Sequence, residues 1–144
     1  MQCYTEAHSR ADKEREPGLG TRNFARGGNL QADELAHKIT DVLSDMQAED
    51  VLLLDIRNAA SFADYFVIGT ADSDRQLSAL ATEIDKRLGK EEKTHPIGRE
   101  GEAASGWVLL DYGDVIVHVF STEQRAYYDL ESLWHAGVPV VRIQ

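Results

Sequence analysis

Hydrophobic residues recur every three or four positions in two stretches of the chain, which is the pattern of an amphipathic helix. In the first stretch they predict a helix of about four turns, with the apolar positions Leu35, Ile39, Val42, Leu43 and Met46. In the second stretch the apolar positions are Leu77, Leu80, Ala81, Ile84 and Leu88. Ser73 and Gln76 predict a capping box that starts this second helix, and Gly89 predicts its end.

Runs of consecutive apolar residues predict four β-strands, at residues 51–56, 64–70, 107–112 and 115–120. The first run is apolar at almost every position, which is typical of a strand covered on both faces. Gly113 and Asp114 predict a short turn, so the last two strands form a hairpin. A short edge strand is expected near residues 95–97.

The C-terminal part of the chain predicts one more helix and one more strand. Ser121 and Gln124 form a second predicted capping box. The helix that it opens is expected to end at Gly137, with the inward residues Tyr127, Leu130, Leu133 and Trp134. Residues 138–143 predict a strand, and Pro139 confines it to an edge or a first position. The sum is an α/β fold, a single domain over residues 31–144 with a mixed sheet flanked by helices.

Residues 1–30 predict a disordered N-terminal tail. They contain few large apolar side chains, charges of both signs, and the chain breakers Pro17, Gly18, Gly20, Gly27 and Gly28. Ordering such a segment would bury little apolar surface.

The composition predicts a folded acidic protein. Of its 144 residues, 42% are hydrophobic and the formal net charge is −10. Residues 1–30 hold 5 basic and 4 acidic residues, so residues 31–144 hold 10 and 21, and the acidity belongs to the predicted domain. This balance argues against docking on nucleic-acid phosphates or anionic lipid and favours a basic partner.

The chain carries the signs of a cytoplasmic protein. Cys3 is its single cysteine, so no internal disulfide is possible and a reducing compartment is expected. No apolar run approaches the length of a membrane span, and the N-terminus lacks the apolar stretch of a signal peptide.

Two carboxylates, Asp72 and Asp74, are the strongest candidates for enzyme chemistry. They follow a predicted strand, as the metal ligands of a nucleotidyltransferase do, and Asp111 or Asp114 would have to supply a third ligand. The alternative is that they flank a helix N-cap, where the helix dipole stabilises carboxylates. The sequence has neither a phosphate-binding lysine motif nor a dinucleotide glycine fingerprint, and its histidines lack zinc-ligand spacing, so we expect no cofactor and no metal.

Aromatic and acidic residues concentrate at the predicted hairpin, namely Trp107, Tyr112, His118 and Phe120 beside Asp111 and Asp114. Alternation along residues 115–120 places Ile116, His118 and Phe120 on one face and three valines on the other. Two interpretations are open. The first is a second packed layer in which His118 is a core histidine. The second is a protein-binding face, since tryptophan and tyrosine supply rigid contact area and carboxylates select a basic partner.

Three blocks of this chain resemble the ribosomal silencing factor family, also called Iojap-like proteins. The blocks are DYFVIGT at residues 64–70, WVLLDYGDVIVHVF at residues 107–120, and Arg125 followed by YDLESLW at residues 128–134. The resemblance runs from about residue 32 to residue 135. It implies a fold similar to that of nucleotidyltransferases without their catalytic carboxylates, and therefore a protein that is not an enzyme.

The resemblance also implies a function and a site. Family members bind the large ribosomal subunit through the ribosomal protein numbered fourteen and block joining of the small subunit, and organelle members assist large-subunit biogenesis. By position, Trp107, Tyr112 and His118 correspond to the family's partner-binding surface, and we add Asp111 and Asp114 on grounds of charge. The alternative function is a metal-dependent nucleotidyltransferase that uses Asp72 and Asp74. A homodimer is a further possibility, because an exposed aromatic face also self-associates.

Overall fold

Six strands form one mixed sheet in the computed structural model, which describes residues 31–133 and 137–143. In sheet order the strands are β3 (Gly98–Glu100), β4 (Trp107–Asp111), β5 (Val115–Ser121), β2 (Tyr65–Ala71), β1 (Glu49–Asp55) and β6 (Val138–Ile143). β2 and β5 pair in parallel, and every other pair of neighbours is antiparallel. The predicted α/β fold with a mixed sheet is confirmed, whereas the predicted disordered tail, residues 1–30, lies outside the described residues.

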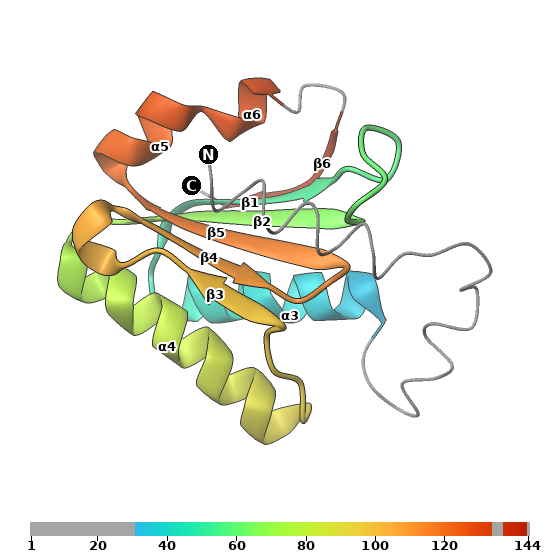
Figure 1. Ribbon diagram of the computed structural model, residues 1–144, viewed down its shortest axis with the longest axis horizontal. Coiled ribbons are helices and arrows are strands. Elements are labelled where there is room, and N and C mark those ends of the chain that lie inside the picture. Colours follow the sequence, from blue (N-terminus) through green and yellow to red (C-terminus); the bar gives the residue numbers. More distant parts are fainter. Residues whose placement is uncertain (1–30, 134–136, 144) are drawn as a thin grey trace.

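Two long helices cover one face of the sheet, which we call the helix face (Figure 1). They are α3 (Ala32–Asp45) and α4 (Asp74–Glu91). All but one of the positions predicted to face inward from these helices are buried; Met46 is half-buried and lies just past the end of α3. The valines of β5 also point to the helix face, as alternation predicted.

The opposite face, which we call the outer face, carries two short helices, α5 (Thr122–Tyr128) and α6 (Leu130–Leu133) (Figure 1). Its apolar cluster comprises Leu52, Leu54, Ile56, Phe62, Ala63, Phe66, Ile68, Trp107, Leu109, Ile116, Phe120 and Leu130. Strand β1 contributes alternate residues to both clusters, so its continuous apolar sequence reflects a strand covered on both faces.

The predicted end of the second helix was wrong, because α4 continues through Gly89 to Glu91. A Cβ atom at Gly89 would lie 2.6 Å from Cε1 of His95, so glycine makes room for the loop that folds back against the helix. The chain leaves the helix at Lys93, whose φ is 54°. The predicted edge strand exists, but it begins at Gly98 instead of near residue 95, and a short 3-10 helix (Ala103–Ser105) follows it.

The predicted C-terminal helix is two helices. α5 ends at Asp129, whose left-handed conformation (φ 46°) redirects the chain into α6. As a result Tyr127, which was expected to point inward, is 78% exposed, while Leu130 is buried as predicted. The side chains of Leu133 and Trp134 lie outside the described part of the chain. In β6, Pro139 occupies the second position, where the register against β1 shifts.

Both predicted N-cap serines are confirmed. Ser73 Oγ accepts a hydrogen bond from the Gln76 backbone N–H at 3.1 Å, and Ser121 Oγ accepts one from Gln124 at 3.2 Å. The Gln76 side chain reaches back one residue further than predicted, because its Oε1 accepts from the Asp72 N–H at 2.6 Å. No helix in the described part of the chain is both long and apolar enough to cross a membrane.

A buried arginine anchors α5 and α6 to the sheet. The Arg125 guanidinium is only 8% exposed; it donates to Thr70 Oγ1 at 2.8 Å and to Glu131 Oε2 at 2.9 Å. It also contacts the carbonyl and carboxylate of Asp50, and the Asp50 carboxylate pairs with Arg142 of β6 at 3.0 Å. One side chain thus connects β1, β2, α5 and α6.

We expect Arg125→Gln to lower the free energy of unfolding by about 3 kcal/mol, because it removes a buried cation together with its ion pair to Glu131 and its hydrogen bond to Thr70, while Asp50 keeps only Arg142. Arg57→Gln is the matched control. Arg57 pairs with Asp55 at 2.7 Å but its side chain is 59% exposed, so the expected loss is below about 1 kcal/mol. Urea unfolding of the three proteins measures both values, and equal losses for the two variants would contradict the anchoring role.

Candidate functional site

The β4–β5 hairpin carries all five residues predicted to bind a partner, but the structure divides them between the two faces. Residues that pair across an antiparallel ladder share a face, and Trp107 pairs with Phe120 while Asp111 pairs with Ile116. Trp107, Asp111 and His118 therefore lie on the outer face. Tyr112 packs on the helix face instead.

An aromatic cluster surrounds Trp107 on the outer face; we define it as Phe66, Trp107, His118, Phe120 and Tyr128. The Trp107 indole N–H donates to His118 Nδ1 at 3.2 Å. The Trp107 ring stacks on Phe120 with centroids 5.1 Å apart, and Phe66 meets His118 edge-on at 4.8 Å. These contacts fix the indole in one orientation. Trp107 is 9% exposed and His118 is fully buried, so the core-histidine interpretation describes His118 in this structure.

The cluster extends to the surface through two tyrosines that the sequence analysis did not assign to the site. Tyr128 lies 4.5 Å from Trp107 between ring centroids, and Tyr127 meets Tyr128 edge-on at 5.0 Å. A signal for this was available, because adjacent helical residues are about 100° apart and cannot both face the core. Tyr127 is the most exposed of the large hydrophobic side chains in the described residues.

Asp111 and Asp114 hold the hairpin turn. Asp111 Oδ1 accepts from the Gly113 N–H at 2.8 Å, which supports the positive φ of Gly113 (88°). The Asp114 carbonyl accepts from the N–H groups of Asp64 and Tyr65, at 2.8 and 3.1 Å, and so ties the turn to the start of β2. The two aspartates are 0% and 5% exposed. Both side chains are thus buried beside the turn, Asp111 through its hydrogen bond to Gly113, and contact of either carboxylate with a partner stays a prediction.

Tyr112 is buried against α4 and is 2% exposed. Its hydroxyl finds no hydrogen-bond partner among the described residues. Burial, and to a smaller extent the nearby Asp85 carboxylate, raises the pKa of this hydroxyl. Tyr112 therefore belongs to the core and presents no surface to a partner.

The structure does not assemble the carboxylates of the enzyme alternative. Asp72 and Asp74 line a crevice of about 290 Å³ where β2 and β5 end. Asp111 pairs with Ile116 at the opposite end of β5, roughly 20 Å away for a strand of this length. The described residues contain no group of three or more His, Cys, Asp or Glu side chains that is arranged to hold a metal ion.

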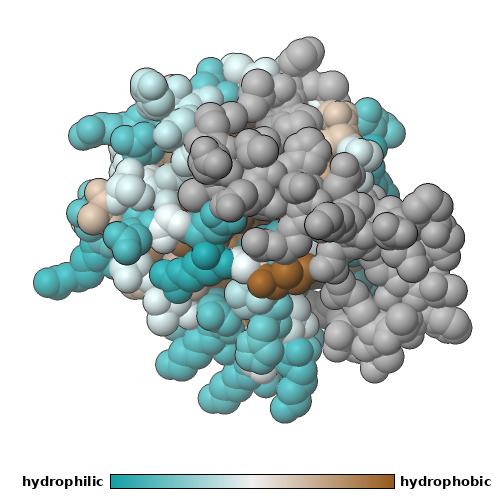
Figure 2. Space-filling model, viewed as in Figure 1, coloured by the Kyte–Doolittle hydropathy of each residue, from teal (hydrophilic) through white to brown (hydrophobic). Residues whose placement is uncertain are grey.

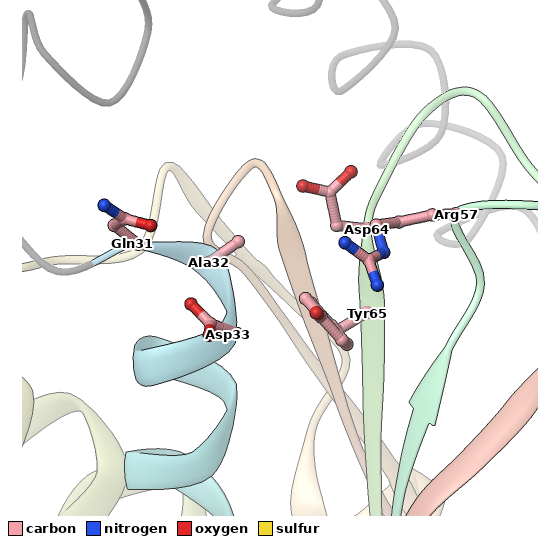
Figure 3. Close-up of a pocket in the computed structure, with 6 residues that line it drawn as sticks. All are labelled: Gln31, Ala32, Asp33, Arg57, Asp64 and Tyr65. Atoms are coloured by element: carbon pink, nitrogen blue, oxygen red, sulfur yellow. The ribbon is translucent and has the colours of Figure 1, made fainter.

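A second pocket, of about 310 Å³, opens between the start of α3 and the start of β2 (Figure 3). Its lining residues are Gln31, Ala32, Asp33, Arg57, Asp64 and Tyr65. The Arg57 guanidinium lies 5.4 Å from the Tyr65 ring centre and pairs with Asp55, and its hydrogen bond to Asp55 lowers the pKa of that carboxyl. The start of α3, at one side of the pocket, is closed by its own capping box.

We expect Tyr112→Phe to raise the free energy of unfolding by about 1 kcal/mol, because it removes a buried hydroxyl that lacks a partner and keeps the ring. Tyr127→Phe is the control: its hydroxyl is on a side chain that is 78% exposed, and its removal should change little. Urea unfolding measures both variants. A Tyr112→Phe protein less stable than the parent would show that the hydroxyl has a favourable contact.

The buried imidazole of His118 predicts a pH dependence of stability. Burial lowers the pKa of His118 to about 3 in the folded protein, from an ordinary value of 6.5. Between these values the unfolded chain binds a proton that the folded protein does not, so stability falls as the pH drops, by up to about 1.4 kcal/mol per pH unit. His118→Gln should lack this contribution. Urea unfolding of both proteins from pH 7 to pH 4 compares the slopes, and equal slopes would contradict the burial of a neutral imidazole.

Comparison with known proteins connects this arrangement to a family. The family model described as "Ribosomal silencing factor during starvation" matches residues 29–144. The chain is 37% identical over 115 residues to Ribosomal silencing factor RsfS of Halalkalibacterium halodurans, covering 80% of this chain and 97% of that protein. It is 46% identical over 90 residues to the protein of the same name from Bacillus subtilis, covering 62% and 75%.

A solved structure agrees with these sequence matches. The crystal structure of a Chromobacterium violaceum protein superimposes with a TM-score of 0.69 at 36% sequence identity, covering 74% of this chain and 88% of that one. The resemblance noted in the hairpin and in β2 thus extends over the whole described fold. The chain belongs to the ribosomal silencing factor family.

Proposed function

We propose that this protein is a translation repressor that binds the large ribosomal subunit through its ribosomal protein numbered fourteen and sterically blocks joining of the small subunit. Family membership supports a ribosome-associated role in translation. The observation that carries the finer proposal is the aromatic cluster, because it sits in the sequence block that resembles the family's partner-binding surface and continues outward to an exposed tyrosine.

The charge of the chain supports a protein partner in preference to ribosomal RNA. The formal net charge is −10, and residues 31–144 carry 21 acidic and 10 basic residues. Phosphates would repel this domain, whereas a basic ribosomal protein would attract it and speed its docking. On the face seen in Figure 2 hydrophilic side chains predominate among the coloured atoms, with a small apolar patch between them.

The five residues predicted to bind the partner differ in burial and contacts, and we propose their roles accordingly. Trp107 remains the proposed contact, through the exposed margin of its indole. His118 orients that indole through the Nε1–Nδ1 hydrogen bond, and Asp111 and Asp114 shape the turn beside it. Tyr112 supports the hairpin from the helix face. Direct contact with the partner is thus proposed for one of the five, with the other four as its support.

Repression by steric exclusion of the small subunit requires no chemical reaction. A domain bound on the face of the large subunit that meets the small subunit excludes the latter by its volume, and the bound lifetime sets the strength of repression. We therefore assign the protein no catalytic residue and no cofactor, and we place it with ribosomes in the cytoplasm.

Trp107→Ala should weaken binding to large subunits by about 2 kcal/mol or more, roughly 30-fold, if Trp107 is a binding hot spot. Co-sedimentation of the protein with purified large subunits measures this. Because the indole packs on Phe120 and Tyr128, the same change also destabilises the fold, and circular dichroism must show that the variant is folded at the assay temperature.

Trp107→Phe is the matched control, since it keeps an aromatic ring in the stack while losing the hydrogen bond to His118 and the extra ring area of the indole. Its binding should fall between the parent and the alanine variant. Adding the parent protein to separated subunits should also reduce the formation of whole ribosomes in a sucrose gradient. If the Trp107→Ala variant is folded and co-sediments like the parent, Trp107 is not part of the interface. If the parent protein does not reduce subunit joining, the proposed repressor function is wrong.

A further inference from the structure

The solvent-facing side of α5 carries one aromatic ring, that of Tyr127, which is not packed into the core. Tyr127 is 78% exposed, and its contact is the edge-on meeting with Tyr128, at 5.0 Å and an interplanar angle of 85°. Tyr128 in turn touches Trp107. The ring is thus held from behind by the aromatic cluster while most of its surface faces solvent. An exposed tyrosine that contacts a buried aromatic cluster is the kind of side chain that anchors protein interfaces.

A carboxylate lies on the same side of the helix, one turn earlier. Glu123 is exposed and precedes Tyr127 by four positions, the spacing at which helical side chains are neighbours. Among the described residues Glu123 makes no ion pair. The one basic residue of α5, Arg125, turns inward to Thr70 and Glu131. The exposed side of α5 therefore presents a negative charge and an aromatic ring, with no cation of its own.

We propose that Tyr127 and Glu123 together bind an arginine side chain of the basic protein on which this chain docks. A guanidinium stacks on an aromatic face and at the same time donates hydrogen bonds to a carboxylate, and it does both better than an ammonium group. This inference rests on the proposed function, because it adds a second contact to the same interface. A second copy of this chain fits the surface less well, since two domains of strong negative charge repel each other.

The test measures the affinity of the full chain for purified large ribosomal subunits. Tyr127→Ala should bind about 5-fold to 30-fold more weakly, whereas Tyr127→Phe keeps the ring face and should bind like the parent. Glu123→Gln should also bind more weakly and should show a smaller loss of affinity when salt is raised. Ile97→Ala is the control for a generic apolar effect, because Ile97 is 43% exposed but lies on the loop before β3. It should leave the affinity unchanged.

A double variant examines whether one cation contacts both side chains. If it does, Tyr127→Ala combined with Glu123→Gln should lose less affinity than the product of the two single losses, because each single change already weakens the shared contact. If the two losses of affinity multiply fully, the side chains act independently, and the proposal that one arginine contacts both is wrong. The exposed positions of both side chains mean that melting temperatures should stay close to that of the parent.

The outcomes separate this inference from the proposed function. If the parent protein does not bind large subunits, both the proposed function and the Tyr127–Glu123 contact are wrong. A parent that binds, with a Tyr127→Ala variant that binds equally well, overturns only the Tyr127–Glu123 contact. A Tyr127→Ala variant that changes self-association in sedimentation velocity and leaves subunit binding intact also overturns it, because the surface would then serve a second copy of the chain.

Discussion

The parallel pairing of β2 with β5 is the interaction on which the rest of the structure depends. It runs over seven residue pairs, from Tyr65 opposite Val115 to Ala71 opposite Ser121. Each of the two strands also has an antiparallel neighbour, so this ladder joins the three antiparallel strands β3, β4 and β5 to the three antiparallel strands β2, β1 and β6. A slip by one residue would move His118 from the outer face to the face that packs on the long helices. The orientation of the whole aromatic cluster is therefore set by this register.

The β2–β5 ladder also determines where helices α4 and α5 begin. β2 and β5 end side by side; Ser121, the last residue of β5, caps α5, and Ser73, two residues after the end of β2, caps α4. From this common edge α4 turns to the helix face and α5 turns to the outer face (Figure 1). The arrangement gives the protein a thick, apolar layer on one side and two short helices on the other. The candidate site lies on the side with the short helices, where the aromatic cluster is part of a second buried apolar cluster.

Burial explains why much of the fold was predictable from the sequence. The runs that became β1, β2, β4 and β5 and the periodic stretches that became α3 and α4 are dictated by apolar positions, and their bounds were close. The errors concern local backbone geometry. Nothing in the sequence around Gly89 indicates that His95 folds back on it, and nothing at Asp129 separates a helix break from a continuous helix.

The candidate site was predicted less well, although part of the missing signal was present. Trp107 and Tyr112 are an odd number of positions apart in one strand, so alternation already places them on opposite faces. The adjacent pair Tyr127 and Tyr128 likewise implies one exposed ring. The inward position of the Asp111 and Asp114 carboxylates depends on the backbone conformation of a particular turn, and residue type alone does not reveal that.

The charge network around Asp50 has a consequence for solubility. Strand β1 contains the run Val51, Leu52, Leu53 and Leu54, and its outer hydrogen-bonding edge is covered by β6. Unpaired edges with such sequences invite strand exchange between molecules. Asp50 holds Arg142 of β6 on one side and Arg125 of α5 on the other. The contacts that anchor α5 to the sheet thus also hold β6 on β1 and keep this apolar strand from pairing with other copies of the chain.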